Sequence, residues 1–222
     1  MENKALITER AEIISKQGFE IKIGKSSIVH PQAKINALNG PIIIGERNLI
    51  EERSVIINEN KEVMIIGDDN VFEVGCEIKA RMVGSNCIFG IKSRIGAAVS
   101  VQDGVVMASK CEVDSKIVDS KTVPTTIKEC TSVFGENSEH WRVVKQIPTS
   151  QSQQIDYLKN VLPKYSAFKN VGPAPKSGNY SGFWSEISKL HSKNLKNDQI
   201  EVVELKYVNA LYHTLKSADL DS

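Results

Sequence analysis

A period of six residues constrains this chain more than any other feature of its sequence. A large apolar residue returns at every sixth position in one uninterrupted run: Val83, Phe89, Ile95, Val101, Met107 and Val113. Three earlier triplets keep the same spacing: Ile23, Val29 and Ile35; Ile44, Ile50 and Ile56; Ile66, Phe72 and Ile78. A fixed internal period is typical of a repeat architecture, in which each repeat buries its apolar face only against its neighbours.

The residues that accompany these apolar positions indicate which repeat fold is present. A glycine often follows the apolar residue, where a sharp corner favours a residue without Cβ, as at Gly24, Gly45 and Gly67. A small residue comes four positions after the apolar one. Because side chains alternate along a strand, this small residue also points inward, which suits a narrow core. The pattern resembles the hexapeptide repeat of left-handed parallel β-helices, in which three repeats form one triangular coil, and the handedness comes from this resemblance alone.

The repeats predict an all-β domain over residues 1–147. Five coils are expected at 23–40, 44–61, 66–82, 83–100 and 101–118, with irregular coils from about Ile7 and from Val123 to about Phe134. Turn-forming residues at 39–41 and 58–62 interrupt the period, so we expect loops that bulge from a corner. The loop at 58–62 is expected to project furthest.

A helical pattern replaces the repeat after Pro148. Apolar residues at helical spacing predict a helix within 148–170 whose apolar stripe lies along the β-helix: Ile155, Leu158, Val161, Leu162, Tyr165 and Phe168. Pro163 is expected to kink or split this helix. Residues 171–222 are expected to form an extension, with a linker rich in glycine and proline at 171–182 and two further helical stretches.

The charges and the apolar runs exclude several classes of partner. The chain has 28 lysine and arginine residues against 27 aspartate and glutamate residues, so it has no general field for nucleic acid or an anionic membrane. No apolar run has the length of a signal peptide or a membrane span, so we expect a cytosolic or nuclear protein. The four cysteines form no CxxC pair and are expected to be free thiols in a reducing compartment.

Four stretches carry a resemblance to one family. They lie at 29–35, 40–52, 64–76 and 156–165, and the most specific parts are Asn-Leu-Ile-Glu-Glu at 48–52 and Asn-Val-Phe-Glu-Val-Gly-Cys at 70–76. Their order and spacing are similar to the dynactin subunit 6 family, over roughly residues 20–170. Residues 171–222 extend beyond the family pattern, and the stretch at 110–127 is less regular than the pattern.

The resemblance implies a subunit without catalytic residues, cofactor or metal. Its implied partners are dynactin subunit 5, dynactin subunit 4 and the pointed-end actin-related protein, in a complex that caps the actin-like filament and helps dynein select cargo. The implied location is the cytoplasm and the microtubule cytoskeleton, with the kinetochore during mitosis as a further site. We expect the partner interface at two corner segments that match the family motif, through Asn48, Glu51, Glu52, Asn70 and Glu73.

Two enzyme classes share the hexapeptide-repeat fold and stay open as alternatives. A γ-class carbonic anhydrase needs three histidines around zinc, whereas a hexapeptide acyltransferase uses one histidine as general base. Of the four histidines only His30 lies on the regular coils, and the others are His140, His191 and His213. Cys76, Cys87 and Cys111 fall on the small inward position, where a thiol packs as a small apolar group. The supply of histidine therefore favours a structural subunit over an enzyme.

Overall fold

The computed structural model describes residues 4–16, 18–114, 116–118, 121–123, 125–135, 138, 140–144, 147–148 and 151–165. The chain divides into two compact units, Met1–Ala174 and Pro175–Ser222, and all the described residues belong to the first. The predicted extension at 171–222 and the end of the predicted helical segment at 166–170 lie outside the described residues. The predicted division of the chain into the parts 1–147, 148–170 and 171–222 stays a prediction.

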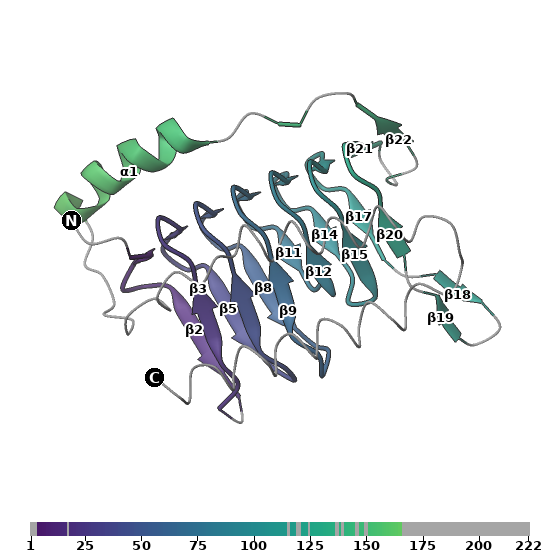
Figure 1. Ribbon diagram of the computed structural model, residues 1–222, viewed down its shortest axis with the longest axis horizontal. Helices are drawn as coiled ribbons and strands as arrows, with labels where there is room; N and C mark the ends of the chain where they lie inside the picture. Colours follow the sequence, from purple (N-terminus) through teal and green to yellow (C-terminus); the bar gives the residue numbers. More distant parts are fainter. Residues whose placement is uncertain are drawn as a thin grey trace, which may run out of the picture. The chain divides into compact units, whose positions relative to one another are not determined.

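Three sheets run along the β-helix, and each of the first six coils contributes one strand to each sheet (Figure 1). The first sheet contains β1 (Leu6–Ile7), β4 (Ile28–Val29), β7 (Leu49–Ile50), β10 (Val71–Phe72), β13 (Ile88–Phe89), β16 (Val106–Met107), β21 (Thr131–Phe134) and β22 (His140–Val143). The second contains β2 (Glu12–Ser15), β5 (Lys34–Ala37), β8 (Val55–Asn58), β11 (Glu77–Ile78), β14 (Arg94–Ile95) and β17 (Glu112–Val113). The third contains β3 (Ile21–Ile23), β6 (Ile42–Ile44), β9 (Met64–Ile66), β12 (Met82–Val83), β15 (Val99–Val101) and β20 (Thr125–Ile127).

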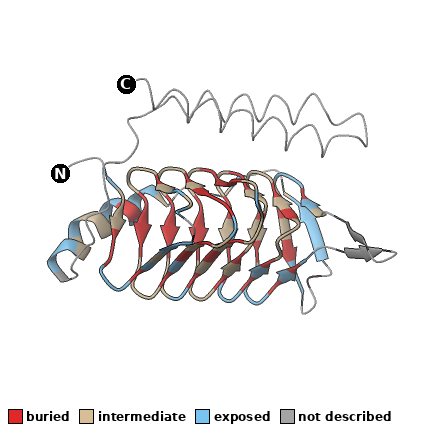
Figure 2. Cartoon of the chain, turned by 90° about the horizontal axis from the view of Figure 1, so that it is seen from below, coloured by how far each residue is buried: buried red, intermediate tan, exposed pale blue. Residues whose placement is uncertain are grey.

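The register confirms the predicted repeat. In the third sheet Ile23 pairs with Ile44, Ile44 with Ile66, and Ile66 with Val83, so equivalent repeat positions stack in a column. Every apolar residue of the predicted six-residue series is buried, including Ile95 and Val101 (Figure 2). The rings of Phe72 and Phe89 stack in neighbouring coils with their centroids 5.1 Å apart. Because strand side chains alternate, a slip of one residue would turn this whole column outward.

The chain leaves the β-helix near the end of the fifth predicted coil, 101–118. Residues 116–118, assigned to the coil 101–118, instead form β18 (Lys116–Val118), which pairs antiparallel with β19 (Lys121–Val123). The period would place Asp119 at the inward position, and burying an unpaired charge is costly. The coil resumes at β20, where Ile127 pairs with Val101. The last part of the predicted coil 101–118 is therefore wrong.

The corner loop at 58–62 is held against the corner. Asn58 Nδ2 donates to the carbonyl oxygens of Pro41 and Glu62, both at 2.8 Å, and Asn58 is fully buried. Asn60 Nδ2 donates to the carbonyl oxygen of Ala97 at 3.1 Å. These bonds tie the loop to its own corner and to a later coil of the stack.

One helix, α1 (Ser152–Tyr165), packs on the outer side of the first sheet, as predicted (Figure 1). Ile155 is buried against Ile28, Leu49 and Val71, the outward residues of three successive strands. Leu158 and Leu162 pack on the same cluster. Pro163 lies inside the last described turn of α1. The parallel stacking of the coils and this helix confirm the predicted parallel β-helix of hexapeptide repeats with a C-terminal helix, and its left-handed sense stays a prediction.

Candidate partner interface

The predicted interface residues lie at the two corners that border the first sheet. The first corner joins the third sheet to the first and carries Asn48 and Asn70, which lie side by side in neighbouring coils. The second corner joins the first sheet to the second and carries Glu51, Glu52 and Glu73. The two groups of residues have different environments.

Asn48 and Asn70 are fully buried and connect successive coils. Asn48 Nδ2 donates to the carbonyl oxygen of Gly67 at 2.9 Å, and its Oδ1 accepts the Asn70 amide at 3.0 Å. Asn70 repeats the pattern on the next coil, with Nδ2 donating to Gly84 O at 2.9 Å and Oδ1 accepting the Cys87 amide at 2.8 Å. Buried side chains of this kind cannot meet a partner, so we correct the expected surface by removing both residues from it.

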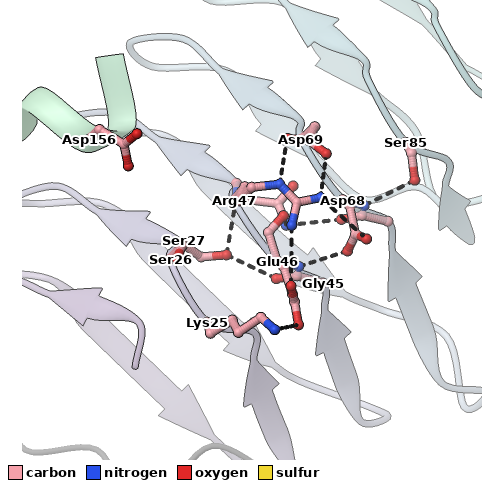
Figure 3. Close-up of polar contacts among 12 residues, drawn as sticks. Lys25, Ser26, Ser27, Gly45, Glu46, Arg47, Asp68, Asp69, Ser85 and Asp156 are labelled. Carbon is pink, nitrogen blue, oxygen red and sulfur yellow. Dashed lines mark hydrogen bonds and ion pairs between the residues drawn. The ribbon is translucent and has the colours of Figure 1, made fainter. Parts of the chain in front are cut away.

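Charged residues cover the outside of the first corner (Figure 3). Arg47 donates to Asp69 of the next coil through both Nε and Nη2, at 2.8 and 2.6 Å, and this bond is the main cause that raises the pKa of Arg47. Arg47 Nη1 also reaches Glu46 at 3.2 Å, and Lys25 Nζ reaches Glu46 from the preceding coil at 3.3 Å. Paired guanidinium and carboxylate groups fix the geometry of such a site.

Close stacking of the coils explains the glycines of this corner. A Cβ at Gly45 would collide with Oδ1 of Asp68 and with the backbone of Gly67. The same Asp68 Oδ1 accepts the amide of Glu46 at 2.7 Å, and burial raises the pKa of Asp68 against the opposing effects of this bond and of Arg47. The left-handed conformation falls instead on Arg47 and Asp69, with φ of 53° and 58°. The glycine is therefore required by the approach of the next coil rather than by its own φ.

Sequence reasoning did not identify Glu46, Arg47, Asp68 and Asp69 as parts of the site. The signal was present in the repeat itself, since Gly-Glu-Arg-Asn at 45–48 and Gly-Asp-Asp-Asn at 67–70 occupy the same place on adjacent coils. Opposite charges at equivalent positions of a stacked repeat face each other across the ladder. A comparison of adjacent repeats would have paired Arg47 with Asp69.

The second corner holds the predicted glutamates together with His30. His30 Nδ1 lies 2.8 Å from Glu52 Oε1. Glu51 Oε2 accepts the amide of Val74 at 3.2 Å, and Glu73 Oε2 accepts the amide of Ile91 at 2.9 Å. Glu51 and Glu73 are therefore partly buried and bonded to the backbone of the next coil, whereas the Glu52 side chain remains 46% exposed.

The pKa directions follow from these contacts. Burial raises the pKa of Glu51, and the neighbouring charges of Glu73 and Glu52 add to it while His30 opposes it. For Glu52, burial acts to raise the pKa, but the bond to His30 and a backbone bond outweigh it, so the pKa of Glu52 is lowered. The corner thus carries a partly exposed carboxylate with a lowered pKa, Glu52.

The described residues do not bring together the groups of a metal site. Within the described ranges, no group of three or more His, Cys, Asp or Glu side chains could hold a metal ion. His140 lies in β22, where its ring centroid is 5.3 Å from that of Phe134, and His191 and His213 lie outside the described residues.

Burial raises the pKa of Cys76 and raises that of Cys87 to about 12, as expected for thiols that pack in the core. Among the described helices, none is long and apolar enough to cross a membrane.

No family model matches the chain. The comparison with curated proteins, in contrast, places it in a family. Dynactin subunit 6 of Nematostella vectensis is 40% identical over 176 residues, which cover 74% of this chain and 89% of that protein. Dynactin subunit 6 of Danio rerio is 36% identical over 164 residues, covering 68% of this chain and 80% of that protein. Among solved structures, a hexapeptide transferase family protein of Anaplasma phagocytophilum matches 72% of this chain and 88% of its own, with 17% identity and a TM-score of 0.47.

The likeness to the curated relatives extends over most of their length at an identity well above 30%. The chain belongs to the dynactin subunit 6 family.

Proposed function

We propose that this chain is a non-catalytic structural subunit of dynactin that supports dynein-driven, microtubule-based transport and cargo selection. The observation that carries the proposal is the 40% identity to a protein named dynactin subunit 6, 89% of which the chain covers. The described part of the site supports it, because its histidine and carboxylates bond to each other and to the backbone of adjacent coils. Such bonds stiffen a surface for a partner.

The partners in this proposal are dynactin subunit 5, dynactin subunit 4 and the pointed-end actin-related protein. The chain would work as one member of this hetero-oligomer, in the cytoplasm and on the microtubule cytoskeleton, and at the kinetochore during mitosis. The near balance of 28 basic and 27 acidic residues supports protein partners over nucleic acid or lipid.

Affinity purification tests the proposed function. A tagged copy of the chain, expressed in its own cells at the native level, is recovered and the associated proteins are identified by mass spectrometry. We expect the dynactin subunits, with the pointed-end subunits at equal stoichiometry. Recovery of the chain without any dynactin subunit would contradict the proposal.

Among the residues expected at the partner interface, we assign the contact with the partner to the partly exposed carboxylate of the second corner, Glu52. The side chain of Glu52 is 46% exposed, while Glu51 and Glu73 bond to the backbone of the next coil. The Arg47–Asp69 pair borders the same sheet on its other side. A charge at an interface rim sets orientation and association rate more than stability.

Charge reversal of Glu52 tests the assignment. Glu52→Lys should lower recovery of the pointed-end subunits several-fold, because a like charge then faces the partner. The matched control is Glu112→Lys, since Glu112 has a side chain 59% exposed on another sheet. Both variants should fold. Glu112→Lys should melt within a few degrees of the unmodified chain, because an exposed charge contributes only about 0–1 kcal/mol, and Glu52→Lys should melt slightly lower because it also loses the bond to His30. Equal recovery with the two variants would remove Glu52 from the interface.

A further inference from the structure

Exposed apolar side chains gather at the C-terminal end of the β-helix. The described residues include seven large hydrophobic residues that are exposed, and four of them lie between 134 and 147. They are Phe134 at 41%, Trp141 at 43%, Val143 at 72% and Ile147 at 54%. Trp141 and Val143 belong to β22, all four residues of which are exposed. Trp141 and Val143 lie on one face of β22, and adjacent exposed apolar groups of this kind indicate an interaction site.

Strand β22 is the terminal strand of the first sheet. It pairs antiparallel with β21, and among the described residues no strand pairs with its other side. The amide of Val144 donates to Cys130 O at 2.7 Å, so the N–H of Val144 faces β21. Since hydrogen-bonded pairs alternate along an antiparallel ladder, Arg142 also faces β21, whereas the N–H and C=O groups of Trp141 and Val143 point to the open side. This edge therefore offers two donors and two acceptors to a further strand.

The side chains of β22 alternate in character. Trp141 and Val143 lie opposite Val133 and Thr131, which are buried, so they extend the inner face of the coil. His140 and Arg142 lie opposite Phe134 and Ser132 on the outer face. A strand that pairs with β22 would thus meet apolar groups on one face and a guanidinium group on the other.

The neighbouring edge in the second sheet is already occupied in part. Strand β17 ends that sheet, and the amide of its Glu112 donates to Ser138 Oγ at 2.7 Å. Ser138 therefore occupies one amide of the β17 edge, while all four residues of β22 stay exposed. An exposed edge with apolar side chains and no proline or bulge invites pairing with another chain.

A second copy of this chain fits the edge poorly. The antiparallel register that uses the outward groups of both Trp141 and Val143 sets Trp141 of one β22 strand opposite Val143 of the other. It therefore places Arg142 opposite Arg142, and like charges directly opposite each other are destabilising. A partner strand with an acidic residue at that place would instead form an ion pair. The charge on the outer face thus selects an acidic partner over a second copy.

We propose that β22 is a docking edge that accepts an extended strand of a partner protein in which apolar and acidic residues alternate. The strand would add to the first sheet by main-chain hydrogen bonds to Trp141 and Val143, with its apolar side chains on the Trp141 side and its acidic side chains beside Arg142. This mode of binding uses other residues than the Glu52 corner, and it does not depend on membership of dynactin.

The test uses the full chain and a short synthetic peptide of alternating valine and glutamate. Amide hydrogen exchange at Trp141 and Val143 should slow by about tenfold or more when the peptide is added, because both amides gain acceptors. In Val143→Pro the outward N–H is lost while the ladder to β21 is kept, and an edge strand tolerates proline where its N–H faces solvent. This variant should melt like the unmodified chain yet lose the slowing at Trp141. Val143→Thr is the matched control and should keep it.

Three results of the exchange experiment would overturn the proposal. They are unchanged exchange in the unmodified chain at saturating peptide, equal slowing in Val143→Pro, and equal slowing by a peptide of alternating valine and lysine. A dimer of the unmodified chain that is lost in Val143→Pro would identify a second copy as the occupant and would also overturn it. Absence of dynactin subunits after affinity purification would contradict the proposed function alone, since the peptide experiment decides the docking edge separately.

Discussion

Replacing Asn70 by alanine should destabilise the β-helix without changing its surface. The side chain of Asn70 satisfies two buried backbone groups of the next coil, Gly84 O at 2.9 Å and the Cys87 amide at 2.8 Å. Each buried polar group left without a partner costs about 1–3 kcal/mol, so losing both bonds costs about 2–6 kcal/mol. Removing the buried amide relieves its own desolvation, and we expect a net loss of about 3 kcal/mol in the free energy of unfolding.

Thermal melting by circular dichroism measures this loss. For a chain of this size a change of 1 kcal/mol shifts Tm by about 2–4 °C, so Asn70→Ala should lower Tm by about 6–12 °C. The control is Asn36→Ala, because Oδ1 of Asn36 is buried without a hydrogen-bond partner among the described residues. Its removal should leave Tm nearly unchanged. Equal shifts in the two variants would refute the assignment of Asn70 as a link between coils.

Three further predictions follow from the core and the second corner. Ile95→Asp should lose about 4 kcal/mol or more of stability, because it buries an unpaired charge at a position only 1% exposed, and unchanged melting would contradict the register. Burial raises the pKa of Glu51, so its native state holds a proton more tightly than the unfolded chain and stability falls as pH rises through that pKa. Glu51→Gln should therefore raise Tm at pH 7, and the gain should vanish below about pH 4; a gain that grows with acid would contradict this. A thiol reagent at pH 8 should label Cys130 first and should reach the buried Cys76 and Cys87 only on unfolding, as mass spectrometry of the labelled peptides would show.

The register of the coils could be predicted because the repeat leaves little freedom. Each strand has one large inward residue, and the alternation of side chains fixes which residue that is, so Ile95 and Val101 could be placed from spacing alone. The helix on the first sheet could be predicted for the same reason, since Ile155 and Leu158 share one helical face. In both places a single apolar pattern decides the packing.

Features that depend on contacts between coils escaped the sequence pattern. The position of Asn48 and Asn70 marked them as inward, but their role became clear only when the backbone of the next coil was in place beside them. Asp119 explains why the coil stops, yet nothing in the period specifies the antiparallel pair β18 and β19 that follows. Strand β22 carries no repeat signal, so the exposed edge with Trp141 could not be foreseen.

Sedimentation of native cell extract tests the central claim most directly. The chain has a mass of 24.5 kDa, and a free subunit would sediment at that size. If it is an assembled dynactin subunit, a tagged copy at native level should sediment entirely with the other dynactin subunits in one large species. A pool that sediments as a free monomer or as a homotrimer, apart from dynactin, would contradict the account.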